Sequence, residues 1–267
     1  MSARRAAGDA RRWPGLGFAA AVFFAYVYLP IFILVILSFN ENRIVTIWTG
    51  FSLEWYRMAF ANDDILRAAG NSLLIASVAA TSATVLATLA AVRMATTRFF
   101  GQTGMNALLA LPITVPEIVP AVATLMFFAS LGVTLGLGTV MIAHTVFCIP
   151  FAYLPIRARL EGMDPKLGEA AADLFANPRQ AFFKVTLPLL MPGILSGFVL
   201  AFIISLDDFV TTFFVGGAGS TTLPIYIFGL VRTGVTPEVN AISALMLLVS
   251  IALVSLSLFL GRSEHRY

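Results

Sequence analysis

Two adjacent aspartates, Asp207 and Asp208, lie in the segment SLDDFVTTFF and are the only charged residues between Lys184 and Arg232. A third acid, Glu117, is similarly isolated in a long uncharged stretch. Carboxylates without a neighbouring base suit the binding of a cation. The alternative is structural, with each acid protonated, hydrogen-bonded between helices or paired with another subunit.

The composition places these acids in an integral membrane protein. Of the 267 residues 59% are hydrophobic and 12% are charged, about half the ~25% charged residues of soluble domains. A charge at the bilayer centre costs ~2.5–3.5 kcal/mol on insertion scales. Acids inside spans therefore require a specific reason.

Charged residues divide the chain into segments of membrane-spanning length. We predict an all-α fold with a tail at 1–15, a membrane domain at 16–261 and a tail at 262–267. The six expected helices are Leu16–Phe39, Ala68–Val92, Gly104–Ala129, Gly138–Ile156, Pro192–Val215 and Val239–Leu260.

The distribution of lysine and arginine predicts the orientation of the chain. The two tails and two of the connecting segments hold 13 of these residues, and the other segments hold 4. By the positive-inside rule both termini are cytoplasmic. Asp207 then lies about 22 Å along the fifth helix, in the outer half of the bilayer.

The sequence offers little for covalent chemistry. It has no GxxxxGK[ST] phosphate loop and no evident nucleophile–base set, so we expect neither an enzyme nor a bound cofactor. His144 and Cys148 are four residues apart, but two ligands do not make a metal site. We interpret both as packed helix residues.

Helix geometry refines the prediction for the acids. Three prolines flank Glu117 in LPITVPEIVP and should weaken the third helix, and irregular backbone at membrane depth is tolerated where it lines a cavity. On a continuous helix Asp207 and Asp208 diverge by about 100°. One is expected to face a solute path and the other to face helix packing.

The loop between the fourth and fifth helices is predicted to hold two short helices. DPKLGEAAADLFA has a possible cap at Asp164 and a proline suited to the first turn, and Pro178–Val185 would form the second helix. From composition alone, this loop could equally be a solvated amphipathic segment.

This loop, about 160–190, resembles the EAA loop of ABC-importer permeases. The matching residues are Glu169, Ala170, Ala171, Val185, Leu187 and Pro188. The chain departs from the pattern at Phe175, where the family has glycine, and phenylalanine does not readily adopt a left-handed turn. The resemblance implies a coupling helix that docks on an ATPase. The implied coupling residues are Glu169, Ala170, Ala171, Asp173, Leu174, Phe175, Ala176 and Asn177.

A wider resemblance covers nearly the whole chain. YVYLPIFILVILSFN, WTGFSLEWY, SLDDFV and TGVTPEVNA are similar to PotC-type permeases of spermidine/putrescine importers. The resemblance implies a type I importer fold in the bacterial inner membrane. It also implies a second permease, two ATPase subunits and a periplasmic binding protein as partners.

The combined interpretation is a permease subunit for polyamines. A polyamine requires spaced carboxylates and aromatic faces. The candidate path residues are Asp207, Asp208, Glu117, Ser205 and Trp48. Trp48 could equally belong to an interfacial aromatic belt. The alternatives are an ABC permease for another cationic solute, such as an opine, and a secondary transporter or channel.

Overall fold

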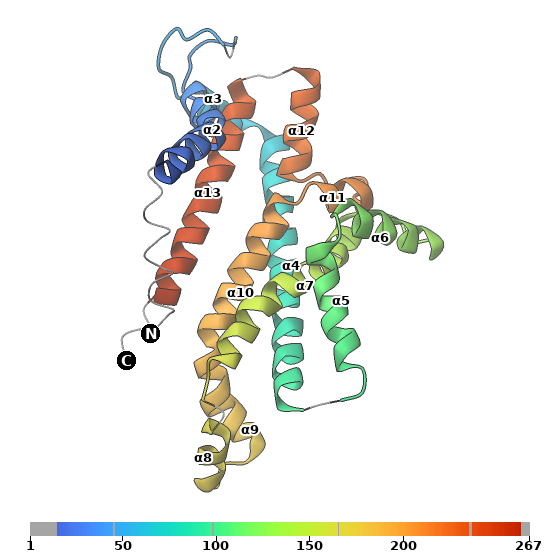
Figure 1. Ribbon diagram of the computed structural model, residues 1–267. Coiled ribbons are helices and arrows are strands. Elements are labelled where there is room, and N and C mark those ends of the chain that lie inside the picture. The colour runs from blue at the N-terminus through green and yellow to red at the C-terminus, as the bar shows by residue number, and fades with distance from the viewer. Residues whose placement is uncertain (1–14, 45, 98, 165, 235–236, 263–267) are drawn as a thin grey trace. The chain divides into compact units, whose positions relative to one another are not determined.

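Most of the described chain is helical (Figure 1). The computed structural model describes residues 15–44, 46–97, 99–164, 166–234 and 237–262, in which no extended strand is present. The predicted tails lie almost entirely outside these residues. The chain forms two compact units, residues 1–61 with 230–246, and residues 62–229 with 247–267.

The number of predicted spans agrees with the structure. Five helical segments are long and apolar enough to cross a bilayer, and a bent helix pair gives a sixth. The five are α2 (Leu16–Leu37), α4 (Asp63–Thr96), α7 (Leu137–Glu161), a continuous run over Pro178–Asp207, and α13 (Pro237–Arg262). The short helices α3 (Glu54–Ala61) and α12 (Leu223–Thr233) were not predicted.

The third predicted span is bent rather than straight. It consists of α5 (Gln102–Thr114) and α6 (Ile118–Ser130), whose axes differ by 112°. Val115 between them is extended, with φ −93° and ψ 138°. The residue before a proline disfavours the helical region, and Pro116 follows directly. The break therefore has a local cause in the sequence.

The prediction for the fifth span was wrong at both ends. The helix begins at Pro178 as α9 (Pro178–Ala181), passes through a π-helical turn, η2 (Phe182–Thr186), and continues as α10 (Leu187–Asp207). The predicted second short helix is thus the start of this span. The helix ends at Asp207, and a separate helix, α11 (Val210–Val215), follows. The two aspartates therefore do not share a continuous helix.

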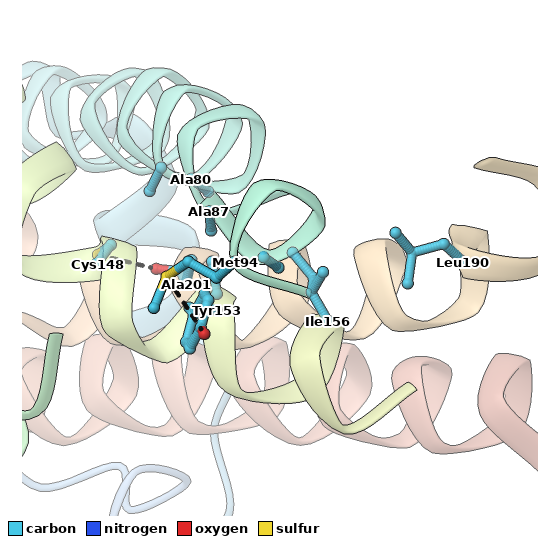
Figure 2. Close-up of a cluster of buried hydrophobic side chains, with 11 residues drawn as sticks. Ala80, Ala87, Met94, Cys148, Tyr153, Ile156, Leu190 and Ala201 are labelled. Atoms are coloured by element: carbon cyan, nitrogen blue, oxygen red, sulfur yellow. Dashed lines mark hydrogen bonds between the residues drawn. The ribbon is translucent and has the colours of Figure 1, made fainter. Parts of the chain in front are cut away.

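The core of the second unit lies where α4, α7 and α10 pack together (Figure 2). Alanines line the α4 side, and Gly197 on α10 lies against the α7 backbone. Small residues let helices approach closely inside a membrane. A β-carbon at Gly197 would lie 2.6 Å from the Ala152 carbonyl oxygen, so no side chain fits there without backbone movement.

We expect Gly197→Ala to destabilise this three-helix core. Overpacking typically costs about 1–3 kcal/mol, since backbone atoms rather than a flexible side chain must move. Gly70→Ala on α4 is the matched control, because a β-carbon there meets nothing within 4 Å. Thermal aggregation of the detergent-purified permease measures both variants. Equal stability of Gly197→Ala and wild type would contradict the close packing.

Asn40 organises the loop that follows α2 in the first unit. Its Nδ2 donates to the Ile47 carbonyl at 2.8 Å, and its Oδ1 accepts from the Thr49 backbone N–H at 3.2 Å. Trp55 Nε1 donates to the Asn40 carbonyl at 2.7 Å. These bonds join the ends of two motifs that the sequence analysis identified separately.

Candidate translocation site

The junction of α10 and α11 separates the two aspartates into different environments. Asp208 has φ −64° and ψ 117°, which ends the α10 helix. Its Oδ1 accepts hydrogen bonds from the backbone N–H groups of Thr211 at 2.9 Å and Thr212 at 3.2 Å. A side-chain oxygen in this position caps the start of a helix. Asp208 therefore holds α11 in place from a buried position.

Asp207, in contrast, is exposed at the last residue of α10. Within the described part of the chain, no basic group lies within ion-pair distance of its carboxylate. A carboxylate that faced lipid at this depth would carry the insertion cost of an unpaired charge. Its exposed carboxylate therefore suits a water-filled path or a contact with another protein.

Glu117 joins the site from the other broken helix. It lies at the start of α6 and is half-buried, and its carboxyl group lies near that of Asp208. The second oxygen of Asp208, Oδ2, is buried and lacks a hydrogen-bond partner in the described structure. Since α6 and α11 pack together, the two breaks bring acids from distant sequence positions to one place.

His144 is the residue of this site that the sequence analysis missed. Its ring is buried on α7, with Nδ1 2.8 Å from the Ser205 hydroxyl and Nε2 2.9 Å from the Thr212 hydroxyl. Nε2 also lies 3.7 Å from Asp208 Oδ1. A histidine inside an otherwise apolar span was the available signal. Ser205, predicted to line the path, is instead buried against this ring.

Cys148 packs one turn further along α7. Its thiol donates to the Ala201 carbonyl at 3.4 Å, as expected for a packed helix residue (Figure 2). The described residues contain no group of three or more potential ligands that could hold a metal ion.

Trp48 and Trp55, which follow α2 in the chain, differ in environment. Trp48 is half-exposed in the first unit, whereas Trp55 is buried and bonded to Asn40. The structure thus leaves only Trp48 available for contact with a solute or another surface.

The EAA-like loop forms a helix–turn–helix at the opposite end of α7 and α10 from the acids (Figure 1). The first helix, α8 (Leu167–Asp173), ends in two bonds, from Phe175 N–H to the Ala172 carbonyl at 2.9 Å and from Ala176 N–H to the Ala171 carbonyl at 3.0 Å. This Schellman pattern places Phe175 at the position where glycine is usual.

Phe175 adopts the left-handed conformation despite its side chain. Its φ is 59°, so the turn geometry of the glycine pattern is retained. Phe175 is 96% exposed and the neighbouring Leu174 is 82% exposed. Asn177 caps α9 by accepting from the Gln180 N–H at 2.8 Å. Glu169, Ala170 and Asp173 are exposed, Ala176 is half-buried and Ala171 is buried.

Residues 83–263 match the family model of binding-protein-dependent transport system inner membrane components. The PotC spermidine/putrescine transport system permease of Haemophilus influenzae is 43% identical over 91% of this chain and 95% of its own. The chain belongs to this permease family. The PotI putrescine transport system permease of Escherichia coli K12 is 41% identical, covering 84% of this permease and 82% of its own length.

Solved structures support the ABC importer fold of the permease. A chain of a bacterial ABC transporter involved in import of the acidic polysaccharide alginate aligns with TM-score 0.69 and 15% identity, covering 97% of this chain and 98% of its own. A chain of the MetNI methionine ABC transporter aligns with TM-score 0.62 and 20% identity, covering 74% and 94%. At these identities the likeness concerns the fold alone. The predicted fold class and family are confirmed.

Proposed function

We propose that this permease forms half of the translocation path of an ATP-driven polyamine importer. The observation that carries the proposal is that Glu117 and Asp208 lie near each other where α6 packs on α11, with exposed Asp207 directly before this break. Relatives at 39–43% identity are named as spermidine/putrescine or putrescine permeases. A polyamine carries several ammonium groups, and acids that form no ion pair with lysine or arginine in the described structure suit such a cargo.

The environments of the three acids suggest different roles. Exposed Asp207 is the candidate for direct contact with an ammonium group. Buried Asp208 supports the helix junction, and the exposure of half-buried Glu117 is intermediate between those of the two aspartates. In this arrangement the Asp207 carboxylate stays accessible, while Asp208 keeps the backbone of the break hydrogen-bonded.

The partners follow from the architecture of an importer. We expect a second permease, two ATPase subunits that bind residues 169–177, and a periplasmic binding protein. From the excess of basic residues we expect the EAA-like loop and both termini to face the cytoplasm. Hydrolysis of ATP would occur on the ATPase, so the chain itself acts by binding and gating.

A secondary transporter that uses the same acids as cation sites is the competing function. The two are separated by energizing uptake in membrane vesicles with ATP or with an ion gradient. An ABC importer requires ATP and is inhibited by vanadate. Uptake that is abolished by an ionophore and insensitive to vanadate would contradict the proposal.

We predict that Trp48→Leu weakens polyamine uptake by severalfold, through loss of a cation–π contact worth about 0.5–2 kcal/mol. Trp55→Leu serves as the contrast, since its loss should instead lower the amount of folded permease. Uptake normalised to assembled complex distinguishes the two effects. Unchanged normalised uptake for Trp48→Leu would assign this residue to the membrane interface.

A further inference from the structure

The break between α10 and α11 has no proline or glycine to cause it. The residues around it are Ser-Leu-Asp-Asp-Phe-Val, and none of them excludes a continuous helix. Locally, the Asp208 side chain accepts bonds from the first turn of α11, and contacts from elsewhere in the fold connect α11 to the end of α10. The His144 side chain of the neighbouring helix α7 makes such contacts.

His144 bonds to both sides of this break. Nδ1 meets the hydroxyl of Ser205 in the last turn of α10, and Nε2 meets the hydroxyl of Thr212 in the first turn of α11. A neutral imidazole donates from one nitrogen and accepts at the other, and a hydroxyl can supply either complement. A single buried ring therefore connects the two helix ends through short hydrogen bonds.

We propose that His144 is a positioning residue that holds the α10–α11 break and thereby keeps Asp207 exposed to the translocation path. His144 need not touch the solute, because its ring is buried behind the break. Loss of either hydrogen bond would leave a buried polar group unpaired, which favours rearrangement of the junction. The proposal rests on the proposed function only for the role of Asp207 in transport.

Site-directed thiol labelling tests the position of residue 207 directly. Cys148 is the only cysteine of the chain, so Cys148→Ala gives a cysteine-free background in which Asp207→Cys can be introduced. The reporter is assembled with its partner subunits in proteoliposomes. The measured quantity is the rate at which a water-borne cationic methanethiosulfonate labels the new thiol.

Two variants remove the hydrogen bonds that His144 makes across the break: His144→Leu removes both, and Thr212→Val removes the one to α11. We expect His144→Leu, and independently Thr212→Val, to lower the labelling rate of residue 207 by about five- to a hundredfold, because the residue would become less exposed. His144→Gln should restore much of the rate, because an amide both donates and accepts. Thr145→Val is the matched control, since the Thr145 hydroxyl bonds only within its own helix, to the Met141 carbonyl at 2.7 Å.

Equal labelling rates in the parent, His144→Leu and Thr212→Val reporters would overturn the proposal. If His144→Leu fails to assemble, Thr212→Val decides, because it keeps the shape of the side chain. Protection of the thiol by spermidine is a separate arm. If spermidine does not protect the thiol but the labelling rate still depends on His144 and Thr212, only the proposed polyamine path is contradicted. The two proposals can therefore fail separately.

Discussion

Asp207→Asn is expected to reduce polyamine uptake by roughly tenfold to a hundredfold without changing the amount of assembled complex. The change removes the negative charge while it preserves the shape of the side chain. A hydrogen bond to a charged group is worth about 1.5–3 kcal/mol, which corresponds to this range. Initial uptake rates of labelled spermidine, normalised to complex content, measure the effect.

Two further substitutions define the cause of the Asp207 effect. Asp63→Asn, on an exposed acid at the start of α4, should leave uptake unchanged. Asp208→Ala should lower stability by about 1 kcal/mol or more through loss of the α11 cap. Normal normalised uptake in Asp207→Asn would contradict the assignment of the accessible charge to the path.

The second large effect is expected at Phe175 in the EAA-like loop. A non-glycine residue in the left-handed region costs of order 1–3 kcal/mol, and such strain is retained where the side chain has a role. We expect Phe175→Ala to weaken ATP-dependent uptake by about tenfold, because we propose that the exposed ring docks on the ATPase. Co-purification of the ATPase with the permease reports the same loss of contact.

Phe175→Gly separates the ring from the turn. Glycine removes the ring and also relieves the backbone strain, whereas alanine removes the ring and retains the strain. If the ring docks on the ATPase, both variants lose coupling. Full coupling in Phe175→Gly would show that only the turn geometry is required, and would contradict a docking role for the aromatic side chain.

Local features of the sequence predicted the spans well, because the cost of placing charge in a bilayer acts on each segment separately. Lys184 and Arg232 bound the stretch in which the two aspartates are the only charges, yet the fifth helix passes through Lys184 into the EAA-like loop. The break at Pro116 also has a local cause. At Asp208 the local signal is a single capping aspartate, and the proposed support from His144 lies 64 residues earlier in the chain, so local patterns did not identify this break.

In the EAA-like loop, too, the sequence predicted some features and not others. The sequence identified the Glu169–Ala171 helix and the missing glycine. It did not reveal that Phe175 would adopt the left-handed turn, because the two hydrogen bonds that close the helix end compete with the steric cost of the side chain. Which of these two opposing contributions is larger can be seen only in the three-dimensional structure.

The central claim is tested most directly by reconstituting this permease with its partner permease, ATPase and binding protein in proteoliposomes. We predict ATP-dependent, vanadate-sensitive accumulation of labelled spermidine or putrescine. Other polyamines should compete with this accumulation, and anionic solutes should not. Absence of ATP-dependent polyamine accumulation in a complex that is fully assembled and hydrolyses ATP would contradict it.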